Sequence, residues 1–247
     1  MKAMVLAAGF GTRLRPLTDD RPKALVELGG RTLIEITLER LSTFGVREVV
    51  INAHHFADKL AHYLAAHQNF GLKIDISHED ILLDTGGGIK KAADLLLAGS
   101  HDGEEPILVH NVDVLSSIDF ARMKQAHNTR GALAMLAVQD RETSRYLVFD
   151  ERGELCGRRL GREATAEIVR PCRHAHTLAF SGIHIISTAL LARLSEQGTF
   201  SIIDSYLRLA AEGEKICAFR ADEYYWRDVG RLEDLEKAER ESKSSRI

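Results

Sequence analysis

A glycine-rich turn near the N-terminus is followed by two basic residues, a combination that suits phosphate binding. The turn runs from Leu6 through Gly9 and Gly11 to Arg13, and Lys23 lies ten residues further on. Glycines after a strand let backbone N–H groups approach phosphate oxygens without interference from side chains. Arginine offers a planar fork that holds a polyphosphate, and lysine adds a point charge. This segment therefore predicts a site for a phosphorylated ligand.

Two better-known phosphate loops do not fit this segment. A dinucleotide-binding fingerprint requires a third glycine where this chain has Leu14, and a Walker A loop requires a Gly-Lys-Ser/Thr sequence that is absent. For Gly9 and Gly11 alone, a tight turn without a ligand is the alternative interpretation. The arginine and the lysine favour the phosphate site.

Two aspartates follow apolar stretches that are typical of strands. Asp113 follows Ile107–Val109, and Asp228 follows Tyr224–Trp226. The carboxyl ends of strands are where open α/β sheets bind ligands, and carboxylates are the side chains that most often hold Mg²⁺. An aspartate at a strand end is also a common cap or turn residue, so position alone leaves both interpretations open.

Five segments occur in the order found in the sugar-1-phosphate nucleotidyltransferases, and the chain resembles that family from residue 3 to about 238. Within the family it is most similar to small single-domain members, the N-acetylmuramate 1-phosphate uridylyltransferases and then the mannose-1-phosphate guanylyltransferases. The matching segments are Leu6–Thr18 with Arg21-Pro22-Lys23, Leu83–Gly88, His110–Asp113, Ala179–Gly182 and Trp226–Gly230.

The resemblance implies a reaction in which a sugar 1-phosphate attacks a nucleoside triphosphate, first of all UTP, and releases pyrophosphate. The substrate supplies the nucleophile, so the protein has to position charged groups and neutralise them. The family uses Mg²⁺, and the resemblance assigns its ligands to Asp113 and Asp228. It assigns catalytic roles to Arg13, Lys23 and Asp113.

The resemblance also implies two sets of binding residues. The nucleotide would contact Leu6, Ala7, Ala8, Gly9, Gly11, Thr12, Arg13, Lys23, Glu79, Thr85, Gly86, Gly87 and Asn111. The sugar phosphate would contact Arg170, Ser181 and Gly182.

The chain departs from the family pattern at two places. Val112 stands where the family commonly has glycine, and we expect its branched side chain to narrow the pocket or shift the ribose. Many members hold the sugar phosphate with the lysine of a Glu-Lys-Pro segment. This chain has no lysine between Lys124 and Lys215, so we expect Arg170 to take that role, with Arg158 or Arg159 as alternatives.

The elements that would position these residues alternate between strand and helix patterns. This alternation predicts an α/β fold with a Rossmann-like, mixed but mainly parallel central sheet flanked by helices. We expect one domain over residues 1–240, with a nucleotide-binding half at about 1–130, a sugar-phosphate-binding half at about 131–240 and a polar tail at 241–247. Strands are expected near 4–6, 49–51, 72–76, 107–109, 133–138 and 178–186 with a hairpin at 146–156, and helices near 33–44, 56–64, 89–97, 188–196, 202–212 and after Gly230.

Composition excludes several other classes of protein. The net charge is −3 and the basic residues are scattered, so neither a nucleic acid nor an anionic membrane is an expected partner. No stretch reaches the roughly 20 apolar residues of a membrane span. Three widely spaced cysteines and an N-terminus that resembles a strand favour a cytoplasmic enzyme. The alternatives are a cytidylyltransferase acting on phosphocholine and an inactive, regulatory sugar-nucleotide-binding protein.

Overall fold

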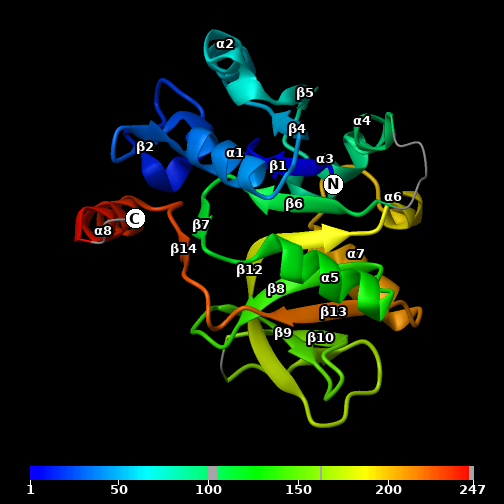
Figure 1. Cartoon of the computed structure of the whole chain (residues 1–247). Helices are drawn as coiled ribbons and strands as arrows, with labels where there is room; N and C mark the ends of the chain where they lie inside the picture. Colours follow the sequence, from blue (N-terminus) through cyan, green and yellow to red (C-terminus); the bar gives the residue numbers. More distant parts are fainter. Residues whose placement is uncertain (100–104, 162, 245–247) are drawn as a thin grey trace.

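One large mixed sheet runs through the centre of the protein in a computed structural model that describes residues 1–99, 105–161 and 163–244 (Figure 1). Its first half contains four neighbouring parallel strands. They are, from the sheet edge inward, β5 (Lys73–His78), β4 (Glu48–Ala53), β1 (Ala3–Leu6) and β6 (Ile107–Asn111). Their carboxyl ends meet at one edge of the sheet, where a ligand site is expected.

The second half of the sheet is mostly antiparallel. It is organised around the long strand β12 (His176–Ile186), which pairs antiparallel with β6, β8 and β9. The other strands are β8 (Ala134–Gln139), β9 (Arg145–Phe149), β10 (Leu155–Leu160), β11 (Glu167–Ile168) and β13 (Ile216–Arg220). Only β13 is parallel to its neighbour, β8. The expected mixed α/β sheet is confirmed, with most of its parallel pairing in the first half.

Helices cover both faces of the sheet, as the alternation of buried side chains in the strands requires. In β1, Ala3 and Val5 belong to one apolar cluster, and Met4 and Leu6 belong to the other. The first cluster includes residues of α1 (Leu33–Thr43), α2 (Ala57–Ala66), α5 (Phe120–Arg130) and α8 (Leu232–Ser244). The second includes residues of α3 (Asp84–Lys91), α4 (Ala93–Leu97), α6 (Ala189–Arg193) and α7 (Ile202–Ala211).

Helix α1 shows how local sequence sets an element of this layer. Thr32 caps its start, because its hydroxyl accepts a hydrogen bond from the backbone N–H of Glu35 at 3.2 Å. Leu33, Leu38 and Leu41 lie on one face of the helix and are fully buried. Burial of each contributes roughly 1.5–3 kcal/mol before entropy is counted. These side chains attach the helix to the face of β1 and β4.

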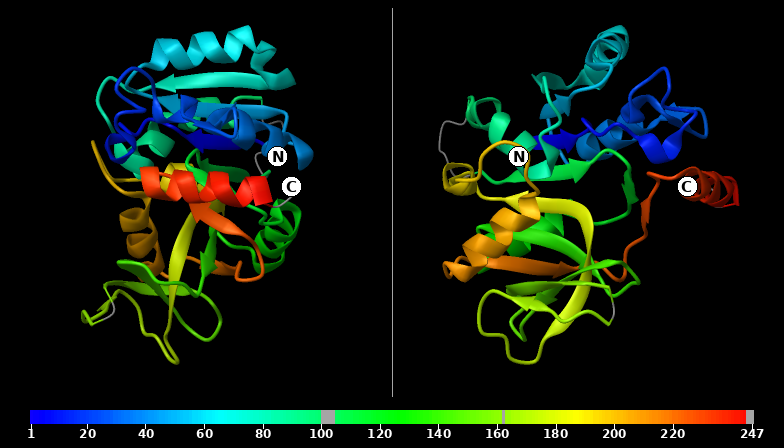
Figure 2. Two further views of the ribbon diagram at one scale, coloured as in Figure 1. Left: turned by 90° about the vertical axis from the view of Figure 1, so that its left-hand side faces the viewer. Right: turned by 180° about the vertical axis from the view of Figure 1, so that it is seen from behind.

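A small two-stranded sheet brings the C-terminal part of the chain back to the nucleotide-binding half. Strand β14 (Trp226–Asp228) pairs antiparallel with β7 (Val114–Ser116), directly after β6. Helix α8 then packs beside β14 and β2 (Glu27–Leu28), which pairs with β3 (Arg31–Thr32) (Figures 1 and 2). Short 3₁₀ helices at Thr12–Leu14, Lys23–Leu25 and Gln68–Gly71 complete the described elements.

Two boundaries differ from those expected from the sequence. Helix α3 begins at Asp84, so the glycines at 86–88 lie inside a helix that was expected only after them. They are needed there because a Cβ on Gly86 would lie 2.4 Å from the ring of Phe200. Helix α8 continues to Ser244 instead of ending at 240, and Glu241 is held by Arg227 at 2.5 Å. The rest of the expected polar tail, 245–247, lies outside the described residues.

In the described ranges, no helix combines the length and the apolar character needed to cross a bilayer.

Candidate active site

Two aspartates that are far apart in the sequence meet where β6 ends. In the β7–β14 pair, Asp228 lies opposite Val114, the residue after Asp113. The backbone N–H of Val229 donates to the carbonyl of Asp113 at 2.8 Å, and the N–H of Gly230 donates to Oδ1 of Asp228 at 2.7 Å. The antiparallel register therefore brings both carboxylates to one point, which the family resemblance implied and their strand-end positions alone left open.

Gly230 marks the point where these groups converge. A Cβ at this position would lie 2.8 Å from Oδ1 of Asp228, 2.9 Å from Oδ2 of Asp113 and 3.1 Å from Nη2 of Arg13. The three charged groups thus surround a single glycine. Sequence reasoning placed Gly230 only at the end of a matching segment and assigned it no site role.

Lys23 supplies a second positive charge at this point. Its Nζ lies 2.9 Å from Oδ2 of Asp113, and both side chains are largely buried, with 14% and 10% exposed. Burial alone would raise the pKa of Asp113, but the positive charges of Lys23 and Arg13 outweigh it and hold that pKa below its usual value. For Asp228, burial and the negative charge of Asp113 act together and raise the pKa.

The glycine-rich turn wraps around Lys23. Gly11 has φ of +65°, a conformation that favours glycine, and its carbonyl accepts a hydrogen bond from the hydroxyl of Thr18 at 2.9 Å. A Cβ on Gly9 would lie 3.6 Å from Nζ of Lys23. The predicted phosphate-binding turn and its lysine therefore lie together. Arg13 is exposed and forms no ion pair within the described part of the chain.

A series of buried hydrogen bonds supports the glycine-rich turn. The backbone N–H of Ala7 donates to Oδ1 of Asn52 at 2.7 Å, and Nδ2 of Asn52 donates to Oε1 of Glu79 at 2.7 Å. The other carboxylate oxygen of Glu79 accepts from the N–H of Leu83 at 2.9 Å. Glu79 is fully buried. Its carboxylate therefore positions the glycine-rich turn, through Asn52, and the segment at Leu83, and it does not face the open cleft.

Two connected cavities lie along the carboxyl ends of the strands. One, of about 410 Å³, is lined by Leu6, Ala8, Gly9, Lys23, Asn52, Leu82, Asp84, Thr85, Asn111 and Thr199. The other, of about 680 Å³, extends over the second half of the sheet and is lined by Ser181, Gly182 and Asp228 among others. Leu6, Asp84, Thr85 and Asn111 line both cavities. After the substrate that their lining residues are expected to contact, we call them the nucleotide half and the sugar half of one cleft.

The segment Leu83–Gly88, which was expected to contact the nucleotide, has a partly structural role. The N–H groups of Gly86 and Gly87 donate to the carbonyl of Phe200 at 3.0 and 3.3 Å. The hydroxyl of Thr85 accepts from the N–H of Ile202 at 3.0 Å. Gly86 and Gly87 are buried and line neither half of the cleft, whereas Thr85 lines both.

Arg170 lies away from both halves of the cleft. Its Nη2 contacts Oε2 of Glu154 at 2.6 Å and Oδ2 of Asp150 at 3.3 Å, at the turn of the β9–β10 hairpin. Two carboxylates already neutralise its charge, so this location does not fit the expected contact with the sugar phosphate. Three other arginines, Arg141, Arg145 and Arg158, line the sugar half.

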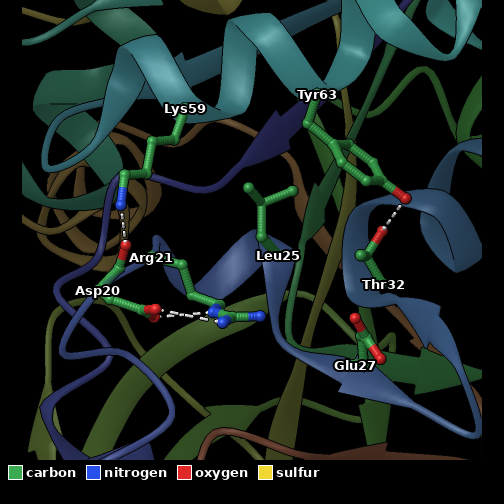
Figure 3. Close-up of a pocket in the computed structure, with 7 residues that line it drawn as sticks. All are labelled: Asp20, Arg21, Leu25, Glu27, Thr32, Lys59 and Tyr63. Atoms are coloured by element: carbon green, nitrogen blue, oxygen red, sulfur yellow. Dashed lines mark hydrogen bonds and ion pairs between the residues drawn. The ribbon is translucent and has the colours of Figure 1, made fainter.

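Arg21, two residues before Lys23, lines a different groove (Figure 3). Its guanidinium binds the carboxylate of Asp20 at 2.8 Å, and Lys59 donates to the backbone carbonyl of Asp20. The rest of the lining of this groove of about 270 Å³ consists of Leu25, Glu27, Thr32 and Tyr63. Of the basic residues in the Arg21-Pro22-Lys23 segment, only the lysine therefore reaches the aspartates.

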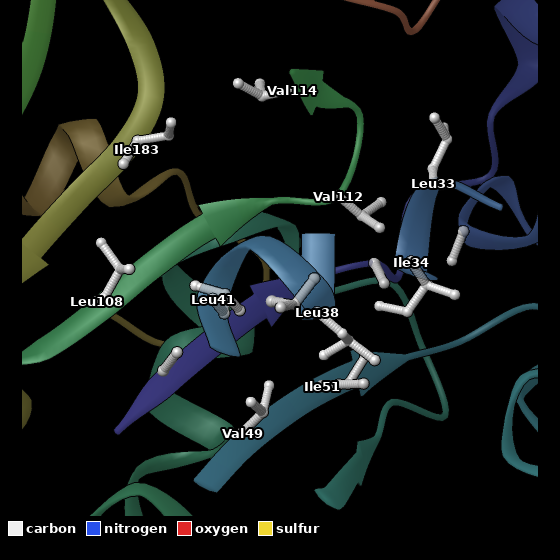
Figure 4. Close-up of a cluster of buried hydrophobic side chains, with 14 of the residues drawn as sticks. Leu33, Ile34, Leu38, Leu41, Val49, Ile51, Leu108, Val112, Val114 and Ile183 are labelled. Carbon is white, nitrogen blue, oxygen red and sulfur yellow. The ribbon is translucent and has the colours of Figure 1, made fainter. Parts of the chain in front are cut away.

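Val112 packs into the core instead of the cleft. Its side chain is fully buried in the cluster that also contains Ile34 and Leu38 (Figure 4). Its backbone N–H donates to the carbonyl of Leu6 at 3.1 Å. The expected narrowing of the pocket by Val112 is not observed, because its isopropyl group is buried in the core and lines neither half of the cleft.

Two further residues of the cleft were not found as site residues from the sequence. Arg141 follows β8 by two positions, and Trp226 donates from Nε1 to the carbonyl of Ser181 at 2.7 Å. Both line the sugar half. A basic residue just past the carboxyl end of a predicted strand was the available signal for Arg141.

Comparisons with known proteins find relatives over nearly the whole chain. Residues 2–245 match the profile of the nucleotidyl transferase family. The N-acetylmuramate alpha-1-phosphate uridylyltransferase of Caulobacter vibrioides is 38% identical over 92% of this chain and 91% of its own length. The mannose-1-phosphate guanylyltransferase catalytic subunit beta of Dictyostelium discoideum is 31% identical over 95% of this chain, which spans only 62% of that relative.

Solved structures share the fold at lower sequence identity. A putative glucose-1-phosphate thymidylyltransferase from Bacillus anthracis, in complex with a sucrose, superposes with a TM-score of 0.79 at 17% identity, covering 100% of this chain and 97% of its own. HddC from Yersinia pseudotuberculosis, complexed with GMP-PN, has a TM-score of 0.75 at 22% identity and covers 97% of this chain and 98% of its own. With a family profile that spans nearly its whole length, this chain belongs to the nucleotidyl transferase family.

Proposed function

We propose that this protein is a uridylyltransferase that joins UMP from UTP to a sugar 1-phosphate and releases pyrophosphate. One observation carries the proposal. Arg13, Asp113 and Asp228 converge around Gly230, and Lys23 pairs with Asp113. Lys23 lines the nucleotide half and Asp228 lines the sugar half of the cleft. Two phosphorylated substrates bound in the two halves would have their phosphates next to this group of charges.

The reaction needs no nucleophilic side chain. A phosphate oxygen of the sugar 1-phosphate attacks the α-phosphorus of UTP and forms a new P–O bond. The bond from that phosphorus to the bridging oxygen breaks, and pyrophosphate leaves with the electron pair. Lys23 is held beside the glycine-rich turn, so it is placed to neutralise the triphosphate. Arg13 is positioned to stabilise the charge that develops on the leaving pyrophosphate.

The two aspartates fit a divalent cation such as Mg²⁺. Their oxygens approach one point, and the raised pKa of Asp228 reflects an electrostatic cost that a cation would remove. Across the residues with described side chains, no cluster of three or more His, Cys, Asp or Glu surrounds a metal-sized space, so the remaining ligands would come from phosphates and water. Bound Mg²⁺ would neutralise phosphate charge in the transition state. We propose Asp113 and Asp228 as its ligands.

The choice of substrates rests on similarity. The Caulobacter relative, which matches over nearly the full length of both chains, is named for N-acetylmuramate 1-phosphate and a uridylyl group. UTP and that sugar phosphate are therefore our first candidates. GTP with mannose 1-phosphate is the second pair, because guanylyltransferase relatives match 95% of this chain.

A pyrophosphate-release assay tests the proposal. Purified protein with Mg²⁺ is given each of UTP, GTP, CTP and dTTP against N-acetylmuramate, mannose and glucose 1-phosphates, with the Asp228→Asn variant as a control. We expect release only when a triphosphate and a sugar 1-phosphate are both present, fastest with UTP, and loss of release in the variant. UTP binding without turnover of any pair would instead indicate a regulatory nucleotide-binding protein.

A further inference from the structure

The three arginines that line the sugar half differ in whether carboxylates of the protein neutralise their charge. Arg158 donates from Nε to Glu167 and from Nη1 to Asp204, each at 2.7 Å, so two carboxylates of the protein hold its charge. Arg145 is exposed and is the first residue of β9. Arg141 is half-buried and forms no ion pair within the described residues.

Contacts on two sides fix the Arg141 side chain. Its guanidinium carbon lies 3.6 Å from the ring centroid of Trp226, close enough for a cation–π interaction. Its Nη2 donates to the carbonyl of Phe180 at 2.8 Å. Its Nε is buried and has no hydrogen-bond partner in the described part of the chain. The side chain is therefore held in one orientation with a donor still unsatisfied.

The two contacts link Arg141 to both segments that define the sugar half. Phe180 precedes Ser181 in β12, and Trp226 belongs to the same short strand as Asp228. Burial disfavours the charged form of Arg141 and lowers its pKa, while the nearby negative charge of Asp228 acts in the opposite direction. A half-buried cation with incomplete compensation gains most from an anion bound in the adjoining cavity.

We propose that Arg141 binds the phosphate of the sugar 1-phosphate and so fills the role of the lysine that this chain lacks. The proposal rests on the proposed function. It follows from the position of Arg141 in the sugar half and its fixed orientation on Trp226, together with the engagement of Arg170 and Arg158 by carboxylates.

Arg40 provides a closely matched control. Its guanidinium carbon lies 5.0 Å from the ring centroid of Phe120, its Nη2 donates to the carbonyl of Ile118 at 2.6 Å, and its buried Nε has no partner among the described residues. It lies in α1 and lines neither half of the cleft. Arg40 thus shares the packing of Arg141 without its position.

The test compares Arg141→Met, Arg141→Lys, Arg170→Met and Arg40→Met with the wild type. Methionine keeps much of the apolar packing and removes the charge. With the substrate pair that the wild type turns over fastest, Arg141→Met should raise KM for the sugar 1-phosphate about tenfold or more, and KM for the nucleotide by less than about twofold. Arg141→Lys should restore part of the affinity, because a lysine supplies the charge without the fork. The other two variants should leave both KM values near those of the wild type.

The outcomes separate this inference from the proposed function. If the wild type turns over no pair, the proposed function fails. If the wild type is active and Arg141→Met keeps the wild-type KM for the sugar phosphate, or if Arg170→Met alone raises it, the assignment of Arg141 is wrong. If Arg141→Met does not fold, Arg141→Lys decides, because an unchanged ratio of the two KM values in that folded variant contradicts a fork-shaped phosphate contact.

Discussion

Nζ of Lys23 lies 2.9 Å from Oδ2 of Asp113, and the two side chains are largely buried. The lysine comes from the glycine-rich segment and the aspartate from the end of β6, so this ion pair joins the phosphate-binding turn to the proposed metal site. It also keeps the pKa of Asp113 low despite burial. Its loss should therefore affect both catalysis and stability.

Replacement of Lys23 by methionine tests this link. The change leaves the Asp113 carboxylate buried beside Asp228 without its strongest positive neighbour, so we expect turnover to be lost and the free energy of unfolding to fall by about 1–3 kcal/mol. Pyrophosphate release and urea denaturation measure the two effects. Lys59→Met, at an exposed lysine near Asp20, should change neither. An active Lys23→Met enzyme would remove the lysine from the site.

Asp228→Asn should separate activity from stability. The carboxylate of Asp228 is destabilised by burial and by Asp113, which raise its pKa. An amide of the same shape removes that repulsion and can still accept the hydrogen bond from Gly230. We expect the metal-free variant to be more stable at pH 7 by roughly 1 kcal/mol, or about 2–4 °C in Tm, while turnover is abolished.

Thermal denaturation with and without Mg²⁺ provides the second readout for Asp228. Mg²⁺ should raise the Tm of the wild type and have little effect on the variant. Asp204→Asn is the matched control, since Asp204 also lines the sugar half but pairs with Arg158. An equal Mg²⁺-dependent rise in Tm for wild type and Asp228→Asn would contradict the assignment of Asp228 to the metal.

Gly230→Ala should damage the site without damaging the fold. The added methyl group would lie within 3.1 Å of Asp228, Asp113 and Arg13, while the backbone at Gly230 does not require a positive φ. Displaced charged groups should lower kcat on the order of 10²-fold with little change in Tm. Gly213→Ala should give the reverse pattern, because φ is +91° there and the site is distant. Wild-type kcat in Gly230→Ala would contradict the convergence of the three groups.

The glycine-rich turn with its basic residues could be predicted as a phosphate site because its signal is local, whereas the strand-end aspartates were assigned to a metal site only through the family resemblance. An apolar run followed by Asp113 or by a Gly-x-Gly turn indicates the end of a strand, and in a parallel sheet that end lies at the ligand-binding edge. Lys23 was found in the same way, through its short separation from the turn. In the structure, the register of β7 and β14 brings Asp113 and Asp228 together.

Ser181 and Gly182 line the sugar half as expected, but its arginines could not be predicted, because they reach the cleft through long-range strand pairing. Arg170 and Arg141 are both arginines near strands, and only the pairing of β9, β10 and β12 decides which one faces the cleft. The expectation that Val112 narrows the pocket was wrong for a related reason. The face of the chain that its side chain occupies depends on the turn between β6 and β7, which the residue pattern alone does not specify.

We expect two buried histidines, His110 and His184, to make the stability of the protein depend on pH. Burial lowers the pKa of His110 to about 4, and burial with the charge of His110 lowers the pKa of His184 to about 3. In the unfolded chain both would titrate near about 6.5. As the pH falls below that value, the unfolded state binds protons that the folded state does not, so stability is lost. Each histidine contributes a slope that approaches about 1.4 kcal/mol per pH unit between roughly pH 6 and pH 4.

Urea denaturation of wild type, His184→Gln and His62→Gln at pH 7, 6 and 5 checks this expectation. Glutamine at 184 can still bond the hydroxyl of Tyr206, the partner of Nδ1 in the wild type, and it cannot take up a proton. The loss of stability between pH 7 and pH 5 should therefore be smaller in His184→Gln by about 1–2 kcal/mol. Replacement of the exposed His62 should leave the loss of stability between pH 7 and pH 5 unchanged. If all three proteins lose stability equally, His184 is not held neutral by burial, and the acid sensitivity has to arise from the carboxylates instead.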